Sequence, residues 1–171
     1  MGMLLSDYSP LNELESEEKM PTTIHAKTGS ILDHSLAEGI AVFIPEGLTA
    51  IKPDAQDFFK QMCGKKMEGA FSFAPVSTQE GKLKYLYMVD NSERRITSLE
   101  DMQNQIYKVL DEFARLGVKS VAMNGIRFDE RPDRNIRPEQ YQRRMIEEYS
   151  AAHPEVFDEI LLVDLNGGFE R

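Results

Sequence analysis

The longest regular alternation of apolar and polar residues in this sequence runs from Ser98 to Leu116. Apolar residues recur there at steps of three and four, which predicts an amphipathic α-helix. Ser98 and Asp101 can cap its start, because a hydroxyl and a carboxylate satisfy free backbone N–H groups. Gly117 allows the left-handed turn that commonly ends a helix. The predicted apolar face of this helix consists of Met102, Ile106, Val109, Leu110 and Phe113.

A short apolar segment follows this helix and predicts a buried strand. Residues 118–123 contain two β-branched valines and carry no charge after Lys119, which is typical of a strand inside a sheet. A charged loop, residues 124–134, leaves the end of this strand. In an open α/β sheet, ligands gather at the carboxyl ends of the strands. We therefore expect any binding site of this protein at this loop.

The remaining apolar segments predict further strands and helices. Residues 39–44 form either a buried strand or a tight glycine turn that leads into one. Asp54 can cap a short helix, and Pro138 is suited to the first turn of another. The further predicted strands are residues 22–27, 39–44, 70–74, 83–89 and 157–165, and the further predicted helices are residues 55–62 and 138–153.

The order of these elements predicts the fold class. Residues 70–74 and 83–89 alternate and are joined by a turn-like segment, which predicts a hairpin. Elsewhere strands and helices alternate, which predicts parallel strands between two layers of helices. We therefore expect a three-layer α/β/α fold with a mixed, mostly parallel central sheet.

Composition and charge limit the classes of partner and the cellular compartment that we expect for this protein. The 171 residues are 41% hydrophobic and carry a formal net charge of -9, which argues against general binding to nucleic acid or to an anionic membrane. No apolar run approaches the roughly 20 residues of a membrane span, and the start of the chain has no secretory pattern. The single cysteine, Cys63, excludes an intrachain disulfide and suits a reducing compartment. We expect a soluble, cytoplasmic protein.

Charge also divides the chain into two parts. In residues 1–20, five acidic residues against one lysine give a net charge of -4. This segment is either a flexible acidic tail or a docking segment that shields a basic patch elsewhere. Residues 21–171 are expected to form a single domain.

Candidate chemistry is concentrated near the predicted strand ends. Residues 127–144 hold six of the ten arginines and are net +2, which suits phosphate recognition or, alternatively, a salt-bridged surface loop. Asp90 and Asp129 are candidate acid or base groups at neighbouring strand ends. The three histidines have no spacing that indicates a metal site, and no metal or cofactor is expected.

Taken together, the order of elements and three short motifs resemble a macro domain, the module that binds ADP-ribose. Residues 24–33 resemble the opening strand and G-D-[IL] motif of this family, with Ser30 in place of the aspartate that contacts adenine. Residues 39–42 resemble the G-x-G-I-A motif of the branch that contains terminal ADP-ribose–protein glycohydrolases. Residues 116–123 resemble its L-G-V-x-S-[IV]-A-[FM] segment.

The resemblance implies a site for ADP-ribose or a related nucleotide diphosphate. Backbone N–H groups of residues 39–41 and 124–126 would hold the diphosphate, with Arg127 assisting. Asp129 or Asp90 would orient or activate water if the protein hydrolyses an ADP-ribosyl linkage. The implied ligand-binding residues are Gly39, Ile40, Ala41, Asn91, Asn124, Gly125, Ile126 and Arg127.

Three functions stay open. The surviving Gly39-Ile40-Ala41 and the arginines favour nucleotide binding, with or without hydrolysis. The glycine-rich loops of the family are absent, and Asp90 and Asn91 stand where the branch has a lysine. These departures favour a noncatalytic scaffold whose charged loop and acidic tail bind a protein partner. An unrelated Rossmann-like enzyme is the third alternative.

Overall fold

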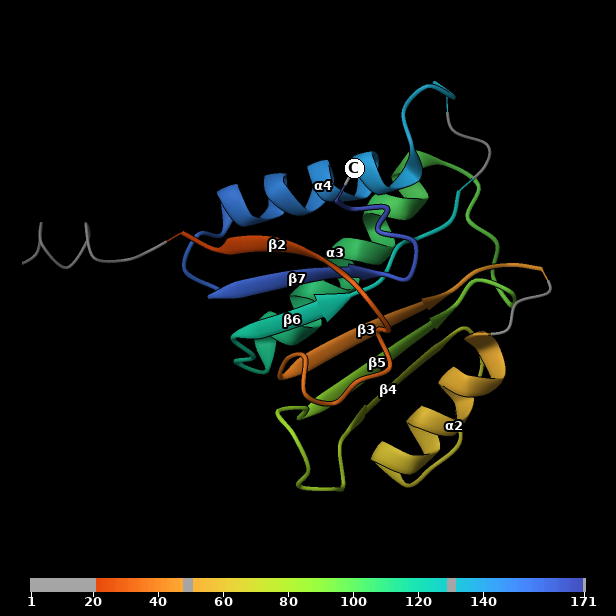
Figure 1. Ribbon diagram of the computed structural model, residues 1–171, viewed down its shortest axis with the longest axis vertical. Coiled ribbons are helices and arrows are strands. Elements are labelled where there is room, and N and C mark those ends of the chain that lie inside the picture. The colour runs from red at the N-terminus through yellow and green to blue at the C-terminus, as the bar shows by residue number, and fades with distance from the viewer. Residues whose placement is uncertain (1–20, 48–50, 129–131, 171) are drawn as a thin grey trace, which may run out of the picture.

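The computed structural model describes residues 21–47, 51–128 and 132–170. Its strands are β2 (Thr23–Thr28), β3 (Gly39–Ile44), β4 (Phe71–Pro75), β5 (Tyr85–Asp90), β6 (Ser120–Met123) and β7 (Glu159–Asp164). They form a six-stranded sheet in the order β2-β7-β6-β3-β5-β4, which crosses the middle of the molecule in Figure 1. Neighbouring strands are parallel except β4 and β5, which pair antiparallel as the predicted hairpin.

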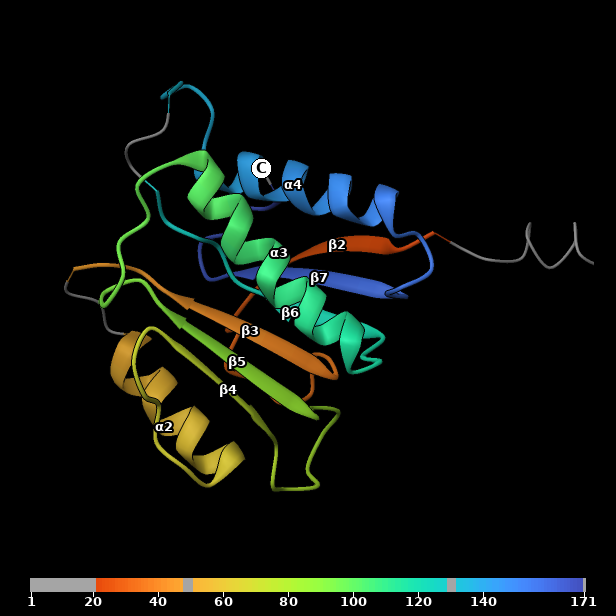
Figure 2. The same ribbon diagram turned by 180° about the vertical axis from the view of Figure 1, so that it is seen from behind.

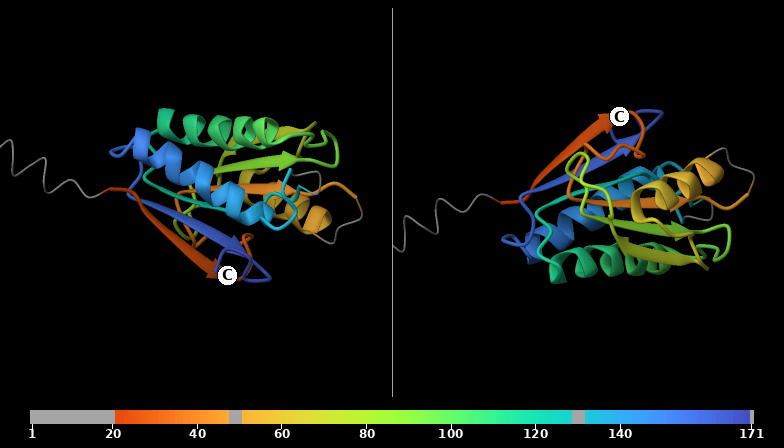
Figure 3. Two further views of the ribbon diagram at one scale, coloured as in Figure 1. Left: turned by 90° about the horizontal axis from the view of Figure 1, so that it is seen from above. Right: turned by 90° about the horizontal axis from the view of Figure 1, so that it is seen from below.

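Helices cover both faces of this sheet. One face packs against α2 (Ile51–Cys63), and the other packs against α3 (Leu99–Arg115) and α4 (Pro138–Ala152). Figure 2 shows α3 in front of the sheet, and Figure 3 shows the layers edge-on. The three-layer α/β/α fold with a mixed, mostly parallel sheet is therefore confirmed.

The sequence pattern explains why α3 forms where it does. Ser98 Oγ accepts a hydrogen bond from the Asp101 backbone N–H at 3.0 Å, and Gly117 adopts a φ of 74° after the helix. All five residues of the predicted apolar face are fully buried. Burying each such side chain contributes about 1.5–3 kcal/mol, so α3 is a main stabilising element of this layer.

The start of α2 differs from the sequence prediction. The helix begins at Ile51 rather than Ala55, so Asp54 lies inside the first turn instead of capping it. A proline is tolerated in the first turn of a helix, because its missing N–H would have no partner there, and Pro53 occupies this turn. The added residues include Lys52, whose ammonium group lies beside Asp90 at the end of β5.

The strands at the centre of the sheet are buried, β3 at every residue and β6 at all but Ser120. Residues 39–44 form β3, so the strand alternative holds and the glycine-turn alternative is wrong. β6 lies between β7 and β3, which confirms the predicted interior strand. These central strands fix where the neighbouring loops meet.

Candidate functional site

The five parallel strands end at one rim of the sheet. The residues at these ends are Thr28, Ile44, Asp90, Met123 and Asp164. The loops that follow these strands gather at this rim, as expected for an open α/β sheet.

A cavity of about 170 Å³ opens at this rim beside the first turn of α2. Leu165 lies at its edge with 68% of its surface exposed, although a large apolar side chain is usually covered. Ligand pockets for drug-sized molecules span about 300–1,000 Å³, so this one has room for a single ring system. We call it the rim cavity. Its lining residues are Gly29, Ser30, Ile31, Leu32, Ile51, Asp54, Asn124, Val163, Asp164 and Leu165.

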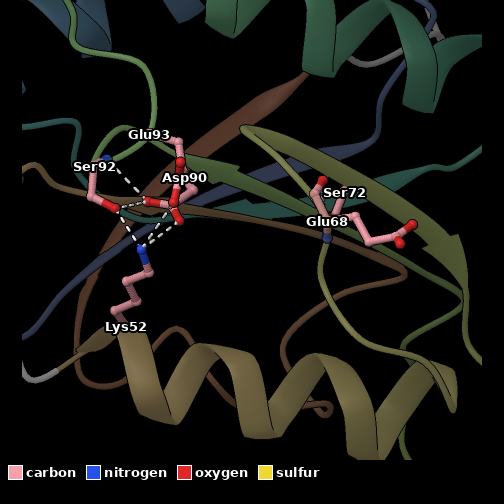
Figure 4. A network of polar contacts seen from close by, with 6 residues as sticks. All are labelled: Lys52, Glu68, Ser72, Asp90, Ser92 and Glu93. Atoms are coloured by element: carbon pink, nitrogen blue, oxygen red, sulfur yellow. Dashed lines mark hydrogen bonds and ion pairs between the residues drawn. The ribbon is translucent and has the colours of Figure 1, made fainter.

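Asp90 is the centre of a polar network on the other side of the α2 start (Figure 4). Its carboxylate accepts hydrogen bonds from the Ser92 backbone N–H at 3.0 Å and from the Ser92 hydroxyl at 2.5 Å. It also lies 3.0 Å from Lys52 Nζ. Lys52 donates a further hydrogen bond to Ser92 Oγ at 2.7 Å and lies 3.6 Å from Glu93. The network ties the first turn of α2 to the end of β5.

These contacts set the charge of both groups. Burial alone would raise the pKa of Asp90, but the hydrogen bonds from Ser92 and Lys52 lower it below its ordinary value. The hydrogen bond to Asp90 in turn raises the pKa of Lys52. Both groups are therefore charged at neutral pH. Asp90 thus holds the Lys52 ammonium at the rim. An ion-paired carboxylate of low pKa is a poor general base, and the predicted acid or base role of Asp90 stays a prediction.

Asn124 extends the pairing of β6 with β3 through its side chain. Its Oδ1 accepts from the Phe43 N–H at 2.7 Å, and its Nδ2 donates to the Phe43 carbonyl at 3.0 Å. Gln142 of α4 is fully buried; it donates to the Asn124 carbonyl at 2.9 Å and accepts from the Ile126 N–H at 2.7 Å. The loop after β6 is thus fixed from two sides.

The structure corrects one part of the predicted site. Gly39, Ile40 and Ala41 lie at the beginning of β3, in register with the beginnings of β5 and β6 and away from the rim. Their backbone belongs to the ladders on both sides, so it does not face a ligand. A Cβ at Gly39 would lie 2.9 Å from Phe113 Cε1, so packing explains this glycine. We exclude these three residues from the candidate site.

One other predicted binding position also needs correction. The Ile126 N–H already donates to Gln142, so it is not free to bind a diphosphate. The Asp164 carboxylate also lies near Gly125, 3.5 Å from where a Cβ would stand. The binding roles of Asn124 and Gly125 stay predictions.

Three further residues of the predicted site are Asn91, Arg127 and Asp129. Asn91 and Gln105 exchange hydrogen bonds of 3.3 and 2.6 Å and are both buried, so Asn91 links β5 to α3. Arg127 is exposed. Asp129 lies outside the described residues.

Sequence reasoning missed Lys52 and Gln142. A lysine in the first turn of a helix is unfavourable, because the helix dipole is positive there. That position was the available signal that Lys52 has an anionic partner. No sequence signal marks Gln142, since its role depends on the path of a loop 16 residues away.

The described part of the chain contains neither a metal-ligand cluster nor a membrane-spanning helix. Within residues 21–47, 51–128 and 132–170, no group of three or more His, Cys, Asp or Glu side chains is placed to hold a metal ion. No helix in these same ranges is both long and apolar enough to cross a membrane.

Comparison with known proteins identifies the fold. No protein-family model matches the chain, and no curated protein matches its sequence. The Trypanosoma brucei macrodomain in complex with ADP-ribose is similar with a TM-score of 0.61 at 10% identity, over 90% of this chain and 72% of that chain. The Thermus aquaticus DarG macrodomain is similar with a TM-score of 0.54 at 14% identity, over 84% of this chain and 99% of that chain.

A further crystal form of the Trypanosoma brucei macrodomain gives a TM-score of 0.59 at 7% identity. The match covers 85% of this chain but only 63% of the length of that macrodomain. These likenesses establish that the chain has the macrodomain fold, as the sequence resemblance implied. They do not distinguish the glycohydrolase-like branch.

Proposed function

We propose that this protein binds ADP-ribose or a related adenine nucleotide at the rim cavity. The observation that carries the proposal is a small, partly apolar cavity at the start of α2, a helix turn that also carries a fixed cation. Ile51 and Asp54 line the cavity, and Lys52, which follows Ile51, holds its ammonium group at the end of β5. Solved macrodomains of the same fold include complexes with ADP-ribose and with ADP.

The surroundings of the rim cavity suit the two parts of an adenosine diphosphate, its base and its diphosphate. Leu32, Ile51 and Leu165 offer apolar surface to a planar base, and Ser30 and Asp54 offer polar groups at its edge. The volume of about 170 Å³ is too small for a whole ADP-ribose molecule, so the diphosphate would lie outside the rim cavity. The start of α2 is favourable for it, because the helix dipole is positive there and Lys52 adds an ammonium group.

The same contacts favour binding over hydrolysis. Asp90 is neutralised by Lys52, and Asn91 is paired with Gln105. Neither side chain is poised to activate water. Asp129 stays a prediction, and a turnover assay on an ADP-ribosylated protein tests it: Asp129→Ala abolishes product release only if the protein is a hydrolase.

A second candidate function is a noncatalytic scaffold. It is favoured by the side chains of three predicted site residues, which all form hydrogen bonds within the protein: Asp90, Asn91 and Asn124. A scaffold needs these contacts for stability and needs no ligand.

Calorimetry with ADP-ribose separates the two functions. We expect micromolar binding by the wild-type chain and at least tenfold weaker binding by Ser30→Trp, because the indole fills the mouth of the rim cavity. Thr23→Trp is the matched control, since Thr23 is exposed at the beginning of β2, away from the loop that holds Ser30. A flat titration of folded wild-type protein would reject nucleotide binding and favour the scaffold.

A further inference from the structure

A second and larger concavity lies beside α4, on the face of the sheet opposite α2. Its volume is about 330 Å³, and three arginines of α4 contribute to its lining. The C-terminal segment, at Gly168 and Phe169, forms its other wall. We call this concavity the α4 groove. It shares no lining residue with the rim cavity.

The arginines of the α4 groove are held in place but remain accessible. Arg137 Nη1 donates to the Gly168 carbonyl at 2.6 Å, and Arg143 Nη1 donates to the Phe169 carbonyl at 3.3 Å. Their side chains are still 30% and 36% exposed, and Arg144 is exposed. A guanidinium has five donors, so the bonds to these two carbonyls fix the positions of Arg137 and Arg143 at the wall of the groove.

The acidic groups of the groove hold these arginines only loosely. Glu139 lies 3.7 Å from Arg137 and Glu147 lies 3.6 Å from Arg143, which is too far for a strong hydrogen bond. Three arginines against two glutamates leave the lining positive, in a chain whose net charge is -9. The groove is therefore a local site for an anionic partner.

We propose that this partner is the acidic segment of the same chain, residues 13–18. This segment has four glutamates and no basic residue, so its charge complements the arginines. Exposed ion pairs are individually weak, and one net positive charge would not retain a free acidic peptide. A tethered segment is present at millimolar effective concentration, so weak pairs are enough.

The tether is long enough to reach the groove. Thr22 donates a hydrogen bond to the Phe157 carbonyl at 2.8 Å, which places the start of β2 near the C-terminal end of α4. Residues 13–18 lie four to nine positions before Thr22, which is about 13 to 30 Å of extended chain. Arg143 lies nine residues before the end of α4, about 14 Å along the helix, so the segment can reach Arg143 and Arg144.

A paramagnetic label on the full-length chain tests this proposal. A nitroxide is attached at Ser16→Cys in a Cys63→Ala background, and the broadening of backbone amide signals is measured. We expect broadening of residues 137–147 at low salt and its loss in about 1 M NaCl, where the Debye length is about 3 Å. Absence of broadening at low salt, or broadening that persists at high salt, overturns the proposal.

Charge reversal on each side supplies the matched comparison. Arg143→Glu/Arg144→Glu should abolish the broadening, whereas Lys65→Glu/Lys66→Glu, the same charge change at exposed residues after α2, should not. Glu15→Lys/Glu17→Lys should also abolish it without altering any described residue, so the test survives if the arginine variant does not fold. Broadening unchanged by the glutamate reversal overturns the proposal. The ADP-ribose titration should be unaffected by all three variants, which keeps this test separate from the proposed function.

Discussion

Lys52 Nζ lies 3.0 Å from Asp90 Oδ2 and joins the first turn of α2 to the end of β5. Asp90 stands where the sequence resemblance places a lysine of the glycohydrolase-like branch. In this protein the lysine at the rim, Lys52, comes instead from the first turn of α2, and the Asp90 carboxylate at the end of β5 holds it in place. A lysine ion-paired in this way supports nucleotide binding and argues against the lysine-linked chemistry of that branch.

Removing the charge of Asp90 should lower stability in a pH-dependent way. Asp90→Asn leaves Lys52 with a weaker partner, and loss of a buried charged hydrogen bond costs about 1.5–3 kcal/mol. Because the pKa of Asp90 is lowered on folding, its contribution is fully present above the unfolded pKa of about 3.9 and is lost as pH falls through the folded value.

Urea denaturation of wild type and Asp90→Asn at neutral pH and near pH 3 checks this. The free-energy difference between the two should be full at neutral pH and should shrink at the lower pH. A difference that is the same at both values would show that the carboxylate charge contributes nothing.

Asn124 should matter for stability more than its neighbour Arg127. Asn124→Ala leaves the N–H and carbonyl of Phe43 without partners, which costs about 1–3 kcal/mol for each buried group. Arg127→Ala at the exposed neighbouring position should change the free energy of unfolding by less than about 0.5 kcal/mol. Equal effects of the two substitutions in guanidinium denaturation would contradict the role assigned to Asn124.

Gly39 should be a packing residue and not a ligand contact. Gly39→Ala places a methyl group 2.9 Å from the Phe113 ring, and such overpacking costs about 1–3 kcal/mol. Phe113→Leu in the same chain should relieve part of this clash, so the two changes together should cost less than their sum. The affinity of folded Gly39→Ala for ADP-ribose should equal that of wild type; a lost affinity would return Gly39 to the site.

Cys63 should react slowly while the protein is folded. Burial raises the pKa of its thiol to about 11, and only the thiolate is nucleophilic. Alkylation near pH 8 should be roughly 100-fold slower than in the urea-unfolded chain, whose thiol has an ordinary pKa of about 8.5. Mass spectrometry of the alkylated product over time measures both rates, and equal rates would show that the thiol is accessible and ordinary.

The fold could be predicted from the sequence because its signals are local. The capped helix α3, the hairpin of β4 and β5, and Pro138 at the start of α4 each follow from residues a few positions apart. The order of elements then limits the topology. The start of α2 was misplaced, because Asp54 signals a cap equally well whether it precedes the helix or lies in its first turn.

The site could not be predicted to the same degree, because it depends on distant pairs. Gly39-Ile40-Ala41 resembles the binding motif in its residue types, yet these residues begin the central strand β3. A glycine is needed at position 39 because the Phe113 ring leaves no room for a side chain. Asn124 was singled out, but its bonds to Phe43 link residues 81 positions apart. Lys52 was missed for the same reason, since its partner Asp90 lies on a separate strand.

The most direct test of ligand binding at the rim is an NMR titration of the ¹⁵N-labelled chain with ADP-ribose. We predict that the amide shifts concentrate in residues 29–32 and 164–165 and at Ile51, Lys52, Asp54 and Asn124, around the rim cavity and the start of α2. Shifts at the opposite strand ends, near Gly39 and Ser120, or no shifts at millimolar ligand, would contradict the account.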